Sequence, residues 1–177
     1  MITYLFKTDE RIRILENILE KYQFTVKDIS TDTNVSKGLV SRYLDSMKKD
    51  GLLERSGRTY HVKNQSFTRA LKIILNLEKI KWDKISPKWV TSAGLYGSWA
   101  SGTNKEDSDL DIWIKVDQYP SEENLNNLYK ILKERTSSEL NILILTREKL
   151  DLLKKNDVPF YNSIKEGSLI LEGELIE

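Results

Sequence analysis

The chain has 177 residues, of which 39% are hydrophobic and 31% are charged, and it contains no cysteine. This composition is typical of a folded globular protein, and it excludes a disulfide framework or a thiolate zinc site. No run comes near the roughly 18 apolar residues that span a membrane, and the first residues are too few for the apolar region of a signal peptide. We therefore expect a cytoplasmic protein that does not enter the membrane.

The net charge of +1 hides an uneven distribution. Residues 1–84 hold 17 Lys and Arg against 11 Asp and Glu, a formal charge of +6, whereas residues 85–177 hold 11 against 16, a charge of −5. Such asymmetry favours a basic part that faces a polyanion and an acidic part with another task. Ordinary scatter among small domains is the alternative explanation.

Residues 1–63 predict three helices followed by a β-hairpin. Thr8 and Ser36 precede periodic apolar positions, as N-cap residues do, and Gly51 follows a basic helix end. The expected elements, in chain order, are a short edge strand over 1–6, helices from Thr8, from about Phe24 to Thr33-Asn34 and from Ser36 to Gly51, and strands over 52–56 and 59–63 around a Gly57-Arg58 turn.

The segment 25–62 resembles a winged helix-turn-helix domain. Residues 34–37 match the turn, 40–44 match the recognition helix, and 50–53 lead into the wing. The resemblance implies a homodimer that binds double-stranded DNA, with the start of the recognition helix in the major groove. Some winged helices bind proteins instead, and this alternative stays open.

The same resemblance implies which side chains meet DNA. The expected contacts are Lys37, Gly38, Ser41 and Arg42 of the recognition helix and Arg58 of the wing. Arg42 is the candidate for base edges. Arg58, together with Arg55 and Lys63, would meet phosphates, which orient a protein without reading sequence.

Residues 64–85 predict a long linking helix that ends near Trp82-Asp83, before the break at Ser86-Pro87. Its wide apolar stripe suits a bridge between domains or a dimer contact. The domain plan is therefore a winged helix over 1–63, the linking helix over 64–85 and a second domain over 86–177.

The sequence of the second domain predicts an α+β fold, in which a small mixed sheet has helices on one side. Strands and helices alternate along it. The expected strands are 89–96, 109–116, 140–145 and 168–171, and the expected helices begin at Ser98, Pro120, Thr146 and Pro159.

Two aspartates open the second of these strands. Side chains two apart in a strand point the same way, so Asp109 and Asp111 should share one face. Magnesium prefers a few carboxylates together with substrate phosphates. The Gly97-Ser98 turn that precedes them offers backbone N–H groups to anionic oxygens. An EF-hand loop counted from Asp107 is excluded, because it would put Ile112 and Gln118 where glycine and glutamate are required.

Gly97-Ser98, ten residues and then Asp109-Leu110-Asp111 resemble the minimal nucleotidyltransferases of the DNA polymerase beta superfamily. The resemblance implies transfer of NMP from an NTP, with ATP the first expectation, and Mg²⁺ or Mn²⁺ as cofactor. Asp109 and Asp111 would bind the metal. The implied nucleotide contacts are Gly97, Ser98, Gly102, Lys105 and Ser108.

The third acidic residue of the family has no direct counterpart. Asn141 occupies its position, and Glu139 lies two residues earlier, on the same face of the predicted strand. Trp99 and Ser101 stand where relatives often have arginine. Both Glu139 and Asn141 are kept as catalytic candidates, whereas His61, the single histidine, is interpreted as structural.

Three functions remain open. The first is an enzyme that modifies an acceptor hydroxyl, since some minimal family members nucleotidylate a partner toxin of the HEPN family. The second is a transcriptional regulator whose degenerate transferase domain senses a nucleotide. The third is a dimeric scaffold.

Overall fold

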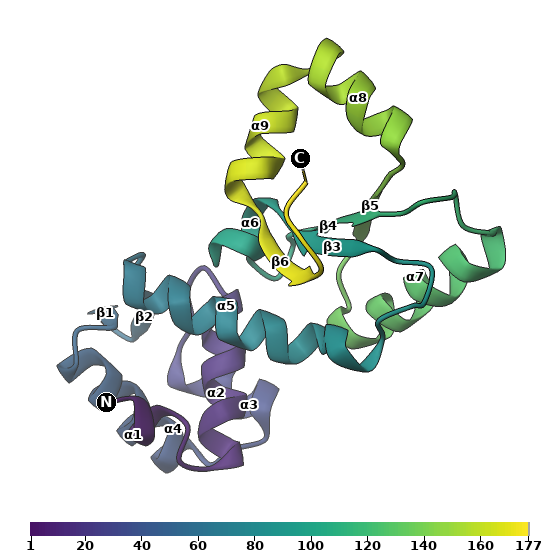
Figure 1. Cartoon of the computed structure of the whole chain (residues 1–177). Helices are drawn as coiled ribbons and strands as arrows, with labels where there is room; N and C mark the ends of the chain where they lie inside the picture. Colours follow the sequence, from purple (N-terminus) through teal and green to yellow (C-terminus); the bar gives the residue numbers. More distant parts are fainter. Residues whose placement is uncertain (177) are drawn as a thin grey trace. The chain divides into compact units, whose positions relative to one another are not determined.

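The computed structural model of the protein describes residues 1–176, which form two compact units divided between Lys72 and Ile73 (Figure 1). The division falls inside helix α5 (Ser66–Ile80). The first unit contains α1 (Ile2–Leu5), α2 (Asp9–Glu20), α3 (Val26–Thr33), α4 (Lys37–Lys49), β1 (Leu53–Ser56) and β2 (Thr59–Val62).

Side-chain caps set the helix starts of the first unit. The hydroxyls of Thr8, Thr25 and Ser36 each accept a bond from a backbone N–H in the first turn, so two predicted N-caps are confirmed and Thr25 is added. The antiparallel pair β1–β2 is the predicted hairpin. Three helices and this wing form the winged helix-turn-helix fold.

The predicted edge strand over residues 1–6 is wrong, because Ile2–Leu5 form a single helical turn. The backbone groups of this segment bond to neighbouring helices rather than to a strand. Arg11 donates to the Tyr4 carbonyl at 2.9 Å, and the Tyr43 hydroxyl donates to the Leu5 carbonyl at 3.0 Å. Alternation over so few residues could not reveal that no partner strand is available.

The second unit holds a four-stranded mixed sheet in the order β5-β4-β3-β6, in which β4 pairs parallel to β5 and antiparallel to β3. After α5 its elements are a 3-10 turn (Trp82–Lys84), β3 (Ser92–Leu95), α6 (Gly97–Ser101), β4 (Leu110–Lys115), α7 (Glu122–Thr136), β5 (Leu140–Leu145), α8 (Arg147–Asn156), α9 (Val158–Gly167) and β6 (Leu169–Glu172). The linking helix ends earlier than predicted, at Ile80, because Lys81 adopts a left-handed conformation.

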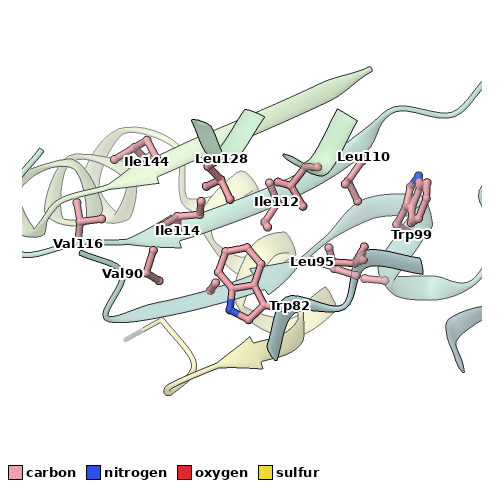
Figure 2. Packing of buried hydrophobic residues seen from close by; sticks show 14 residues of the cluster. Trp82, Val90, Leu95, Trp99, Leu110, Ile112, Ile114, Val116, Leu128 and Ile144 are labelled. Atoms are coloured by element: carbon pink, nitrogen blue, oxygen red, sulfur yellow. The ribbon is translucent and has the colours of Figure 1, made fainter. Parts of the chain in front are cut away.

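Helices cover both faces of this sheet, so the expectation of helices on one side is wrong. Side chains of β4 alternate: Ile112 and Ile114 pack with α6, α7 and Trp82 (Figure 2), whereas Trp113 packs with α8 and α9 on the opposite face. Burial on both faces makes β4 almost continuously apolar after Asp111, which hides the second face from a period-two pattern.

Strand register sets the position of the polar residues at one edge of the sheet. Asp111 of β4 lies directly opposite Asn141 of β5 in the parallel ladder. Asp109, two residues before Asp111, follows the same alternation toward the face that α8 and α9 cover. No helix in the described part of the chain is long and apolar enough to cross a membrane.

Candidate functional site

The turn after β3 lies directly against a carboxylate. Gly97 has φ of +66°, and a Cβ atom built on it would come within 2.5 Å of Asp111 Oδ2. Both the backbone conformation and the lack of space require glycine at this position. The sheet therefore brings the Gly97-Ser98 turn into contact with the start of β4.

Asn141 joins the two aspartates. Its Nδ2 atom donates to Asp111 Oδ1 at 2.9 Å and lies 3.4 Å from Asp109 Oδ2. Asp109 is exposed and Asp111 is half-buried. Because one amide group contacts both carboxylates, these three side chains form a single polar cluster, which we call the acidic edge.

Glu139 is held outside this cluster. Its backbone carbonyl continues the ladder with Leu110, but its carboxylate forms an ion pair with Lys133 of α7. The hydrogen bond from Lys133 lowers the pKa of Glu139, and the same bond raises the pKa of Lys133. Between those two pKa values both groups are charged and paired, so at neutral pH Glu139 is a poor proton acceptor.

The predicted nucleotide contacts surround the turn. Gly102, with φ of +68°, ends α6, and the Ser108 hydroxyl accepts a bond from the Lys105 backbone N–H at 2.8 Å. Burial lowers the pKa of Lys105. The hydroxyl of Ser98 makes no hydrogen bond to any described residue, which leaves it available to a ligand.

Three residues near the acidic edge were missed by sequence reasoning. One is Tyr96, whose pKa is raised mainly by burial and also by the nearby charge of Asp111. Another is Lys133, whose pKa is raised mainly by the hydrogen bond to Glu139 and also by the charge of Asp109. The third is Asn76 of α5, whose role is argued below. Trp99, which stands where relatives often have arginine, is buried in the core at 1% exposure.

In the first unit, basic side chains lie on the outer surface of α4. Lys37 and Arg42 are exposed, and Ser41 is half-buried and lies 3.5 Å from Asp45. The Arg42 guanidinium lies over Gly38, where a Cβ atom would be 3.7 Å from it. This is an ordinary van der Waals distance, so the position of Arg42 does not require glycine at residue 38.

The wing arginines differ in their surroundings. Arg55 donates to the Gly57 carbonyl at 2.9 Å, lies 3.9 Å from the Asp45 carboxylate and covers the Tyr60 ring. Arg58 is exposed and has no ion pair with the described residues. Of the two, Arg58 is the one that is free to meet an external anion.

Two family sequence models match the chain, one in each of the two units. The sequence model of the family described as "Polymerase beta, Nucleotidyltransferase" matches residues 78–173, and that of "Bacterial regulatory protein, arsR family" matches residues 8–55. No curated protein sequence matches the chain.

Two solved structures are similar to parts of the chain. A toxin–antitoxin complex with AMP-PNP is 18% identical, with 59% of this chain and 73% of that chain covered and a TM-score of 0.37. A tri-AMPylated HEPN toxin from Shewanella oneidensis in complex with an MNT antitoxin is 12% identical, with coverages of 60% and 73% and a TM-score of 0.36. At these TM-scores neither likeness supports an inference about function.

The family match covers more than half of the chain, and it includes the whole acidic edge and the turn that contacts it. The chain belongs to the polymerase beta nucleotidyltransferase family and carries an N-terminal helix-turn-helix domain that is similar to the bacterial regulatory proteins of the arsR family.

Proposed function

We propose that the chain transfers NMP from an NTP, with ATP the first candidate, to an acceptor hydroxyl. The observation that carries this proposal is the contact of Gly97 with Asp111, since it sets the Gly97-Ser98 turn beside the carboxylates of the acidic edge. Family membership supports the same chemistry. The acceptor oxygen would bond to the α-phosphorus as the bond to pyrophosphate breaks, and the hydroxyl proton would pass to solvent.

The acidic edge fits a divalent metal ion. The described residues contain no group of three or more His, Cys, Asp or Glu that could hold a metal by themselves. Mg²⁺, however, is ordinarily bound by one or two carboxylates together with substrate phosphates, which suits Asp109 and Asp111. Mg²⁺ or Mn²⁺ held there would neutralise charge on the phosphates.

The residues of the chain would bind and orient the nucleotide. The free hydroxyl of Ser98 and the backbone of Gly97 would hold phosphate oxygens, and Lys105 would supply a cation near them. Asn141 cannot accept the acceptor's proton, and Glu139 is paired with Lys133. Catalysis would therefore depend on positioning and charge stabilisation rather than on a general base from the chain.

The experiment is to incubate the protein with each α-³²P-labelled NTP and Mg²⁺, with and without host-cell lysate. The variant Asp109→Ala with Asp111→Ala should lose Mg²⁺-dependent nucleotide binding and transfer, because both metal ligands are removed. Its circular dichroism should match the wild type, since neither carboxylate is buried in the core. Asp117→Ala, which removes an exposed carboxylate beyond the other end of β4, is the matched control.

The outcomes separate the alternatives. Label transferred by the wild type and by Asp117→Ala, but not by the double variant, would establish the transferase and identify its acceptor. Nucleotide that is bound but never transferred would favour a regulator that senses nucleotide. This second candidate is supported by the presence of Asn141 at the position of the family's third acidic residue. Binding that survives in the double variant would contradict the site.

The remaining proposals concern partners. The arsR-type match and the basic surface of α4 support binding of double-stranded DNA through Lys37, Gly38, Ser41, Arg42 and Arg58. A partner protein as acceptor and a homodimer are proposed on the resemblance of the sequence to minimal nucleotidyltransferases and winged helices, and a cytoplasmic location is proposed on the composition. The lysate arm of the labelling experiment tests the protein acceptor directly.

A further inference from the structure

Two buried asparagines hold the back of the Gly97-Ser98 turn. Asn76 of α5 is 4% exposed, and Asn104, which follows α6, is 1% exposed. Their side chains bond to each other: Asn76 Nδ2 donates to Asn104 Oδ1 at 3.0 Å, and Asn104 Nδ2 donates back at 3.3 Å. Buried amides are costly unless they are paired, so this reciprocal pair is a specific feature of the fold.

Asn76 also satisfies one carbonyl of α6. Asn76 Nδ2 donates to the Trp99 carbonyl at 2.9 Å, while the backbone N–H groups of Thr103 and Asn104 donate to the Ser98 carbonyl at 2.9 and 3.2 Å. A helix of five residues is too short to be stable by itself. The position of α6 is therefore determined by its contacts, and Asn76 supplies one that comes from a distant part of the sequence.

A displacement of α6 would change the geometry of the acidic edge. Gly97 begins this helix and has no free space between its Cα atom and the Asp111 carboxylate. A small movement of the helix would therefore change the distance between the Ser98 hydroxyl and the two aspartates. Errors of about 1 Å in positioning can cost roughly a hundredfold in rate.

We propose that Asn76 is a positioning residue of the nucleotide site. Through the Trp99 carbonyl and Asn104 it holds the Gly97-Ser98 turn at the place where a triphosphate can contact this turn and the acidic edge together. The inference rests on the proposed function, and it makes α5 part of the site rather than only a linking helix. It also gives a role to the amide of Asn76, which is buried on α5 together with the polar residues Thr68 and Lys72.

The test uses the full chain and two substitutions of Asn76. Asn76→Ala removes the amide and leaves a cavity, whereas Asn76→Leu removes it but keeps a branched side chain that fills the site. The control is Thr136→Val, because Thr136 is also buried in the second unit and its hydroxyl bonds only to the Leu132 carbonyl of its own helix. Each protein is measured for thermal unfolding, for amide hydrogen exchange and for affinity toward a fluorescent ATP analogue with Mg²⁺.

We expect both Asn76 variants to exchange the amides of residues 97–104 at least about tenfold faster and to bind the analogue about tenfold more weakly. Thr136→Val should keep its affinity within about twofold of wild type, because its hydroxyl bonds to a carbonyl of its own helix. Asn104→Ala should resemble Asn76→Ala, and the double variant should be little worse than either, because the two side chains act as one unit.

Two results would overturn the inference. Unchanged exchange over residues 97–104 would show that Asn76 does not hold the turn, whether or not nucleotide binds. Faster exchange with unchanged affinity would show that its role is structural only. If wild type fails to bind the analogue while exchange still responds to Asn76, the proposed nucleotide function fails and the positioning of the turn stands as a separate fact.

Discussion

At the scale of single residues, the identity of residue 141 decides the charge of the acidic edge. An aspartate there would meet Asp111 across the ladder and Asp109 beside it, whereas the amide of Asn141 donates to both. The neutral side chain thus lets two carboxylates lie together without a metal. It also removes one ligand charge and one proton acceptor, so residue 141 links the stability of the edge to its chemistry.

The substitution Asn141→Asp should destabilise the metal-free protein by about 1–2 kcal/mol at pH 7, because two hydrogen bonds become contacts between like charges. The neighbouring carboxylates of Asp109 and Asp111 raise the pKa of the new carboxyl in the folded state. The loss of unfolding free energy should therefore grow as the pH rises above the pKa of this carboxyl in the unfolded chain, and it should nearly disappear below that pKa. Saturating Mg²⁺ should restore the stability and raise any transfer rate. Urea unfolding at pH 4 and 7, with EDTA or Mg²⁺, measures these effects.

Asn127→Asp is the matched control, because residue 127 is exposed on α7 and gains the same charge. It should change stability by less than about 0.5 kcal/mol at either pH. Equal stability of Asn141→Asp and wild type in EDTA would mean that the amide does not hold the aspartates together.

At the scale of elements, the sequence predicts the order of helices and strands in the second unit because capping residues and period-two runs are local signals. Ser121 and Thr146 cap α7 and α8, and β5 has the predicted bounds. The second covered face of the sheet could not be predicted, since a strand buried on both faces reads as a continuous apolar run.

The candidate site likewise contains residues that the sequence predicts and residues that it could not predict. Asp109, Asp111 and the Gly97-Ser98 turn are close in sequence, and the family resemblance that their spacing carries predicts a shared site. Asn76 comes from a helix that ends well before the turn, and nothing local predicts that its amide faces the Trp99 carbonyl. Likewise, strand alternation puts Glu139 on the right face but cannot predict that Lys133 takes its carboxylate.

The pairing of β3 with β4 depends on one glycine. Gly94 lies opposite Trp113, and a Cβ atom at residue 94 would be 2.6 Å from the indole ring, which is fully buried and donates to the Ser168 hydroxyl at 2.7 Å. Gly94→Ala should therefore lower the free energy of unfolding by about 1–3 kcal/mol, the ordinary cost of overpacking. Urea denaturation, followed through the unfolding transition of the second unit, measures this change in the free energy of unfolding.

Gly167→Ala serves as the comparison, because a Cβ atom at the end of α9 meets nothing within 4 Å. Alanine has the higher helix propensity, so this variant should be neutral or slightly more stable. If both alanine variants behaved alike, close packing of Trp113 against residue 94 would not be what holds β3 and β4 in register.

At the scale of the whole molecule, the two halves of the sequence carry opposite charge. Residues 1–72 hold 14 Lys and Arg against 9 Asp and Glu, although the complete chain is nearly neutral. Any attraction to DNA phosphates must therefore come from the first unit, and the acidic remainder would oppose it. Because salt screens both effects, the dependence of DNA binding on salt reports on how the basic groups are used.

Arg42 and Arg58 should contribute differently to DNA binding, and Arg13 serves as the control. Arg58→Ala should weaken binding to all duplexes alike and reduce the slope of log affinity against log salt by about 1, as loss of one phosphate contact does. Arg42→Ala should weaken binding to a selected duplex by about 1–3 kcal/mol and change random-sequence binding less, since a base-edge contact carries specificity. Arg13→Ala removes an equal charge from an exposed residue of α2 that is not among the expected DNA contacts, and it should change neither the affinity nor the salt slope. Fluorescence anisotropy between about 50 and 200 mM salt, after selection of a preferred duplex, distinguishes these cases. Salt-independent binding, or three variants with the same effect, would reassign the winged helix to protein interaction.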